Sequence, residues 1–88
     1  MDMDKDTINY FLYFSNKLEE ELKYGDKISI GLLVDEICEV DDIEFLLNIF
    51  EHYSYRLPKD CSEQIAKILL KNPKIKNIVD EYLNSQKD

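Results

Sequence analysis

Very few side chains in this 88-residue sequence could perform chemistry. His52 is the only histidine, and no serine, cysteine or carboxylate stands at a spacing that would form a catalytic triad or a metal site with it. We therefore interpret it as a surface or boundary residue. The two cysteines, Cys38 and Cys61, lack metal-ligand spacing and are too few for a disulfide framework, so reduced thiols are expected. The sequence predicts that the protein is not an enzyme.

Carboxylates dominate one stretch of the chain. This acidic run consists of Asp35, Glu36, Glu39, Asp41, Asp42 and Glu44. The run lacks the alternating ligands and the fixed glycine of a calcium loop, so no metal ion is expected. Residues 1–55 hold 14 acids and 4 bases, a charge of −10, whereas residues 56–88 hold 5 acids and 7 bases, a charge of +2. This distribution disfavours nucleic acid and anionic membranes and favours docking onto a basic protein surface, with solubility as the simpler alternative.

Helices must position these carboxylates, because helical spacing of apolar residues runs through most of the chain. The first helix is predicted from Thr7 to Tyr24, with Gly25 as its stop. Its expected apolar stripe is Ile8, Phe11, Leu12, Ser15, Leu18 and Leu22. Residues 28–38 also have helical spacing, but Gly31 weakens the pattern, so a helix and a loop with one helical turn both remain open.

The second major helix is predicted to start at Asp41, which forms a capping pattern with Glu44. Its apolar face is broad enough for the centre of a bundle, and Leu57-Pro58 is expected to end it, because a residue before proline avoids helical geometry. Two tyrosines, Tyr53 and Tyr82, are expected at the core or its boundary. Two others, Tyr10 and Tyr13, are candidate contacts with a partner.

The last third of the chain predicts two short helices or one kinked helix. Asp60 and Glu63 repeat the capping pattern, and Asn72-Pro73 offers a further helix start. The fold class is therefore all-α, a small bundle of three to four helices that forms a single domain over residues 1–88. No leader-like stretch and no long apolar run stands in the sequence, so a cytoplasmic protein that does not span a membrane is expected.

The stretch CEVDDIEFLLNIFEHYSYRLP, residues 38–58, resembles the recognition helix of acyl carrier proteins and peptidyl carrier proteins. In that family an Asp-Ser-Leu motif is followed by an acidic residue, an apolar position, a Glu, an apolar run and a closing Ile-Pro or Leu-Pro. The matching positions here are Asp41, Ile43, Glu44, Phe45, Leu46 and Leu57-Pro58. The continuations KDCSEQI and IKNIVDEYLNSQ resemble the third and final helices, so the similarity extends from Leu33 to Gln86 and implies an acyl-carrier-protein-like bundle.

The chain departs from this family at the residue that carries the prosthetic group. Cys38-Glu39-Val40 stands where the family has Asp-Ser-Leu, so Glu39 occupies the position of the serine that holds phosphopantetheine. A carboxylate cannot form that phosphodiester, and aligning Ser29 instead would misplace both the helix cap and Leu-Pro. The resemblance implies a protein that docks without carrying a prosthetic group, so no cofactor is expected, and a direct thioester on Cys38 is a more remote option. Its partner-binding residues would be Glu39, Asp41, Asp42, Glu44 and Glu51.

A different class of function fits the same composition. Small acidic helical proteins also serve as immunity or inhibitor proteins that neutralise a basic toxin such as a nuclease. The acidic run from Asp35 to Glu44, with Tyr53 and Tyr55 nearby, would be the inhibitory surface. This alternative explains the missing serine, but it does not explain the Leu-Pro at carrier-like spacing.

Overall fold

The computed structural model describes residues 4–85, and every element within that range is helical. The helices are α1 (Lys5–Tyr24), α2 (Lys27–Glu39), α3 (Ile43–Tyr53), α4 (Lys59–Leu69) and α5 (Lys76–Ser85). The all-α prediction is confirmed for these residues. The predicted count of three to four helices is wrong, because the described range contains five. Residues 1–3 and 86–88 of the predicted domain, including Gln86 of the carrier-like stretch, lie outside the described residues.

The additional helix is α2, which covers the segment that the sequence left open. The Asp26 side chain caps it by accepting a hydrogen bond of 2.8 Å from the backbone N–H of Ser29. Its apolar residues Ile30, Leu33, Val34 and Ile37 are all buried. Burial of this face outweighs the low helix propensity of Gly31, which costs about 1 kcal/mol relative to alanine.

The start and the end of α3 both differ from the prediction. Asp42, and not Asp41, is the capping residue, and its Oδ1 accepts a 3.1 Å hydrogen bond from the backbone N–H of Phe45. The helix then ends at Tyr53, before Leu57-Pro58, and a short turn carries the chain to α4. The Leu-Pro pair therefore belongs to the start of the next helix, where Pro58 is the N-cap residue.

The remaining helix starts also show corrections. Asp60 lies in the first turn of α4, and this helix has no side-chain cap, so the predicted Asp60–Glu63 capping pattern does not form. Asn72 begins a turn in which its Oδ1 accepts a 3.0 Å hydrogen bond from the backbone N–H of Lys74. The helix α5 follows only at Lys76. The C-terminal third thus contains two helices, as one of the two predicted alternatives stated.

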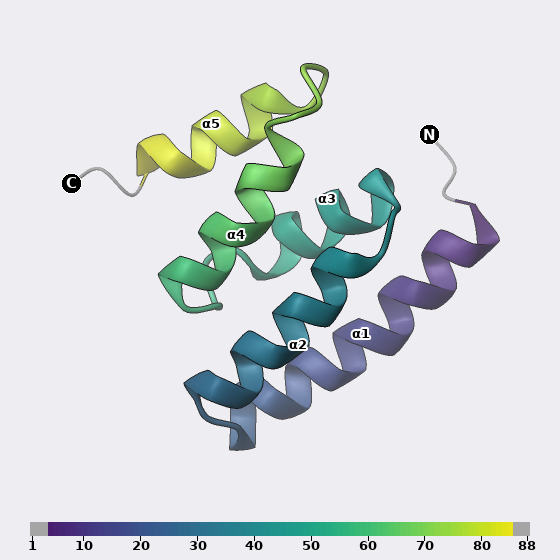
Figure 1. The fold of residues 1–88 in the computed structure, drawn as a ribbon, viewed down its shortest axis with the longest axis vertical. Helices are drawn as coiled ribbons and strands as arrows, with labels where there is room; N and C mark the ends of the chain where they lie inside the picture. Colours follow the sequence, from purple (N-terminus) through teal and green to yellow (C-terminus); the bar gives the residue numbers. More distant parts are fainter. Residues whose placement is uncertain (1–3, 86–88) are drawn as a thin grey trace.

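The helices form a flat bundle of about 38 × 34 × 17 Å. Both α1 and α4 pack against α2 and α3, so α2 and α3 each lie between the same two helices. Figure 1 shows α5 at the edge, where it packs against α4. All five helices contribute to the most deeply buried large apolar side chains, which are Leu18, Val34, Ile37, Phe45, Leu46, Ile49, Phe50, Ile65, Leu69 and Val79.

The buried face of α1 is rotated relative to the expected stripe. Phe14 is buried, whereas Ile8 and Leu12 are 39% and 55% exposed. Positions 7, 11, 14, 18 and 22 face the neighbouring helices, because α1 must contact both α2 and α3. The described residues contain no helix with the length and apolarity needed to cross a membrane.

Candidate functional site

Four of the five predicted partner-binding residues come together where α2 leads into α3. Glu39 is the last residue of α2, Asp41 lies in the connection, and Glu44 lies in the first turn of α3. Glu39 and Asp41 are exposed, and Glu44 is partly buried. We refer to Glu39, Asp41 and Glu44 as the acidic corner. Asp42, the fourth residue, lies between them but has a different role.

Asp42 uses both carboxylate oxygens inside the protein. Its Oδ1 accepts the capping hydrogen bond from Phe45, and its Oδ2 accepts a hydrogen bond from the hydroxyl of Thr7, which is itself buried. The second bond joins the start of α1 to the start of α3 across 35 residues of sequence. Asp42 therefore contributes charge near the corner, while its geometry serves the fold.

Glu51 lies at the other end of α3. It is exposed and is seven residues after Glu44, which places both on one face of the helix and about 10 Å apart along its axis. The structure therefore does not bring Glu51 into the acidic corner. It forms a second acidic position on the same face.

The charges of α2 oppose its helix dipole. Lys27 is the first residue of this helix, whereas Asp35, Glu36 and Glu39 lie in its last two turns. Helix C-termini carry partial negative charge, so carboxylates there are unfavourable. Within residues 4–85 none of the corner carboxylates has a cationic partner within ion-pair distance. The corner is thus a concentration of negative charge that the described part of the chain does not neutralise.

The carboxylate of Glu19, unlike those of the acidic corner, is neutralised by neighbouring side chains. Glu19 on α1 accepts hydrogen bonds of 2.8 and 2.9 Å from both guanidinium nitrogens of Arg56 and one of 3.0 Å from the hydroxyl of Tyr53. The Arg56 guanidinium and the Tyr53 hydroxyl lower the pKa of Glu19 from 4.5 to about 2. We refer to Glu19, Tyr53 and Arg56 as the compensated junction. Nothing in the local spacing predicts it, because Glu19 and Arg56 are 37 residues apart.

Neither cysteine has the environment of an acyl-carrying nucleophile. Burial, with the negative charge of Asp35 as a further cause, raises the pKa of the Cys38 thiol to about 11. Burial also raises the pKa of the Cys61 thiol. Both cysteines are free, and a protonated thiol is a poor nucleophile. These surroundings oppose a thioester on Cys38.

The side chain of His52 contacts the backbone of its own helix, α3. Its Nδ1 lies 2.8 Å from the backbone oxygen of Asn48, and its ring packs 5.2 Å from the ring of Phe11. Among the described residues no group of three or more His, Cys, Asp or Glu side chains is arranged to hold a metal ion. The geometry around His52 is that of a residue at the boundary of the α1–α3 packing.

The phosphopantetheine group does not fit the position that the carrier resemblance would give it. The side chain there is Glu39, an exposed carboxylate at the C-terminal end of α2. Ser29 is in the first turn of the same helix, at the opposite end. No hydroxyl is therefore presented at the attachment position, and no step through that group is derived.

The tyrosines divide between core and surface. Tyr53 and Tyr82 are buried, as predicted, and Tyr10 and Tyr13 are 44% and 56% exposed. Tyr55 is 66% exposed, but it follows the end of α3, whereas the acidic run reaches only the beginning of that helix. The inhibitory surface predicted from Asp35 to Glu44 with Tyr53 and Tyr55 is therefore not assembled as one patch.

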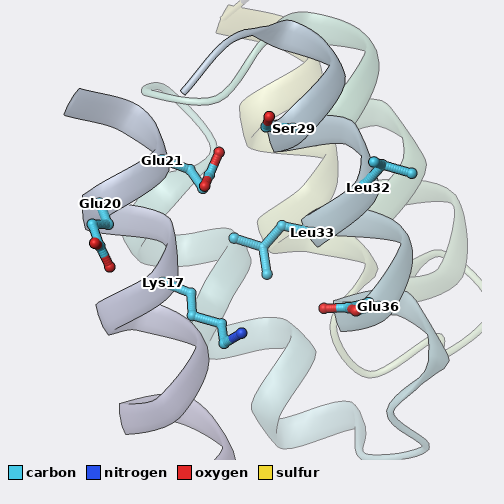
Figure 2. A pocket seen from close by; sticks show the side chains of 7 residues that line it. All are labelled: Lys17, Glu20, Glu21, Ser29, Leu32, Leu33 and Glu36. Atoms are coloured by element: carbon cyan, nitrogen blue, oxygen red, sulfur yellow. The ribbon is translucent and has the colours of Figure 1, made fainter. Parts of the chain in front are cut away.

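The described surface carries several hollows, and two of them adjoin α2 or α3, the helices that form the acidic corner. One, of about 510 Å³, lies between α3 and α5 and is lined by residues that include Glu51, Tyr55, Ile78 and Tyr82. The other, of about 400 Å³, lies between α1 and α2. Its lining is Lys17, Glu20, Glu21, Ser29, Leu32, Leu33 and Glu36. Figure 2 shows Lys17, Glu21 and Leu33 directed into the space between the two helices.

Comparison with known proteins adds no identity to this geometry. The chain matches no protein-family model, no curated protein and no solved structure.

Proposed function

We propose that this protein is a non-enzymatic docking protein that binds a basic surface of a partner protein through its acidic corner. Glu39, Asp41 and Glu44 supply the contact charges, and Glu51 extends the same face of α3. Such carboxylates steer the encounter with Arg and Lys side chains and set its orientation, while each exposed pair adds little affinity.

The observation that carries this proposal is the inverted charge of α2. Glu39 lies at the negative end of the helix dipole, beside Asp41 and without a cationic partner within residues 4–85. A fold under selection for stability alone would place a base there. Residues that cost stability without a local benefit are expected at functional surfaces, and a basic partner would supply the missing compensation.

The class of partner is proposed from the carrier resemblance. By that resemblance Glu39 stands where a carrier protein has its attachment serine, so the chain would have a charge at the centre of the corner in place of a prosthetic group. The protein would then dock onto an enzyme or scaffold of acyl, peptide or lipid assembly without delivering a bound group. It would act in the cytoplasm as a single domain.

The hollow between α3 and α5 favours a second candidate, an immunity or inhibitor protein. It places the exposed ring of Tyr55 beside Glu51 and Ile78, and interface hot spots often combine an exposed aromatic ring with charge. In this case the partner is one basic toxin, and the contact is made at the end of α3 that is opposite to the acidic corner.

Capture of the tagged protein's partner from its host tests the first proposal. The variant Asp41→Lys/Glu44→Lys reverses two corner charges, and Asp60→Lys/Asp80→Lys reverses two charges on α4 and α5 as a matched control. We expect the wild type and the control to retain a partner with a basic surface, in a salt-sensitive manner, and the corner variant to lose it. Retention by the corner variant would contradict the proposal.

The same capture distinguishes the two partner classes. A third variant, Glu51→Lys/Tyr55→Ala, changes only the hollow between α3 and α5. Loss of one basic toxin-like protein with this variant, and not with the corner variant, would establish the inhibitor function instead. Thermal melts of all variants show whether each one is folded.

A further inference from the structure

The outward face of α2 has two halves of different chemistry. Ile28 and Leu32 are 75% and 64% exposed, and Asp35, Glu36 and Glu39 follow them, also exposed. Positions 28, 32, 35 and 39 recur at helical spacing, so they form one stripe along the helix, about 16 Å long. We refer to these four residues as the α2 stripe. It is apolar at its N-terminal half and acidic at its C-terminal half.

The apolar half is larger than these two residues. Tyr24, which ends α1 just before α2, is 84% exposed. Single exposed apolar residues are ordinary, but three large ones fall within nine residues of sequence around the start of α2, and exposed apolar groups of this kind occur at interaction sites. Buried apolar residues on the other face of α2 already supply its packing, so the fold does not require Ile28 or Leu32.

A hollow of about 400 Å³ opens beside the stripe. Leu32 and Glu36 belong to its lining, and α1 contributes Glu20 and Glu21. Three carboxylates against the one ammonium group of Lys17 leave the hollow negative. Figure 2 shows the Glu21 carboxylate directed toward α2, and its Oε2 is buried without a hydrogen-bond partner among the described residues. This oxygen lies against Gly25, at the end of the hollow where α1 leads into α2. An unpaired buried acceptor is costly, so it adds to the unbalanced negative charge here.

We propose that the α2 stripe and this hollow bind a basic amphipathic segment of the partner protein. Apolar side chains of that segment pack on Tyr24, Ile28 and Leu32, and its Arg or Lys side chains face Glu39 and Asp35. Asp35 is exposed, although its Oδ1 also accepts a 2.7 Å hydrogen bond from the side chain of Gln64 on α4. One long basic side chain enters the hollow, with its aliphatic stem on Leu32 and Leu33 and its charge near Glu21 and Glu36. The proposal rests on the proposed docking function and extends the contact from the acidic corner along α2.

Charge decides between this occupant and two others. An anionic membrane would meet the apolar half but repel the acidic half. A second copy related by a two-fold axis would place acids against acids if the stripes ran parallel, and acids against Ile28 and Leu32 if they ran antiparallel. Only a segment with both apolar and basic residues complements the whole stripe.

The test uses the full chain labelled with ¹⁵N and a synthetic helical peptide of leucine and lysine at amphipathic spacing. The matched control for this basic peptide is a peptide of leucine and glutamate at the same spacing. We expect amide shifts along α2 and the facing part of α1 with the basic peptide, and none with the acidic one. Ile28→Ser/Leu32→Ser should weaken binding about tenfold. The control Ile8→Ser/Leu12→Ser removes two exposed apolar residues from α1 and should bind as the wild type does.

Three results would overturn the proposal: equal affinity of the two double variants and the wild type, shifts spread over acids outside α1, α2 and the acidic corner, or self-association of the chain that Ile28→Ser/Leu32→Ser abolishes. Binding to vesicles of phosphatidylserine and phosphatidylcholine in preference to the peptide would assign the stripe to a membrane and would also overturn it. The proposed docking through the acidic corner is tested separately from the α2 stripe, because Asp41→Lys/Glu44→Lys changes the corner and leaves Ile28 and Leu32 intact. If that variant alone loses the captured partner, corner docking stands without the stripe.

Discussion

The compensated junction and the acidic corner are both built from carboxylates on helices, yet the protein treats them in opposite ways. In the junction, Glu19 meets Arg56 and Tyr53 within 3.0 Å, and these donors lower the pKa of its carboxyl group to about 2. In the corner, Glu39 and Asp41 have no ion-pair partner within residues 4–85, and Glu39 opposes the dipole of α2.

This difference separates charged side chains that stabilise the fold from charged side chains that have no stabilising partner among the described residues. The junction joins α1 to the turn between α3 and α4, so its loss should be measured in stability. The side chains of the acidic corner make no such contact within residues 4–85, whereas the neighbouring Asp42 does, so loss of the corner should be measured in binding. The first four predictions below concern stability, and the last measurement concerns binding.

The largest effect is expected where the junction enters the core. Tyr53 is 5% exposed, and Tyr53→Ala should lower the free energy of unfolding by about 3–5 kcal/mol, because it leaves a cavity and removes the hydrogen bond to Glu19. The matched change Tyr55→Ala, at 66% exposure, should cost about 1 kcal/mol or less. Urea denaturation measures both, and equal costs would contradict the division between the two tyrosines.

The adjacent residues Asp41 and Asp42 provide the sharpest comparison. Asp42→Ala removes the cap of α3 and the bond from Thr7, and it should cost about 1–2 kcal/mol. Asp41→Ala should change stability by less than about 0.5 kcal/mol. Asp42→Asn retains a capping oxygen and should recover most of the loss. The account of Asp42 would be wrong if Asp41→Ala proved the more costly change in urea denaturation.

Removing the charge of Glu39 should raise stability. Glu39→Gln relieves the repulsion between this carboxylate and the C-terminal end of α2, by about 0.3–1 kcal/mol at low salt. The gain should shrink at high salt, because the effect is screened. A loss of stability in thermal melts of Glu39→Gln would show that the fold needs this charge after all.

The smallest expected effect is the pH dependence of the junction. The pKa of Glu19 falls from 4.5 to about 2 on folding, so its contribution to stability is complete above pH 4.5 and is lost as the pH falls toward 2. In Arg56→Gln the first cause of this shift is absent, so less stability should be lost over the same window. Urea denaturation between pH 6 and pH 2 measures it, and parallel pH profiles for the two proteins would contradict the assigned cause.

The spacing of apolar residues and the stop signals in the sequence were sufficient to predict the all-α class and some of the helix boundaries. The first helix ends at Tyr24 before Gly25, as predicted, because a strong period and a stop signal agree there. It was insufficient where tertiary contacts decide. Burial of Val34 and Ile37 makes α2 helical despite Gly31, and Thr7, 35 residues away, is bonded to Asp42 rather than to Asp41.

The candidate site was predictable only as a set of residues. Sequence placed Glu39, Asp41 and Glu44 in one acidic run, and the end of α2 together with the start of α3 brings them to one corner. It could not show that Asp42 is bonded internally or that Glu51 lies at the far end of α3. The role of Asp42 depends on where α3 begins, and the place of Glu51 depends on where α3 ends. Both boundaries differ from the prediction.

The most direct test of the central claim is the rate at which the captured partner associates with the protein, measured by stopped flow over a range of sodium chloride concentrations. For the wild type we expect a rate that falls steeply with salt, and for Asp41→Asn/Glu44→Gln a slower rate with a weaker salt dependence. The control Asp60→Asn/Asp80→Asn should follow the wild type. Equal rates and equal salt dependence for all three proteins would show that the acidic corner does not dock the partner.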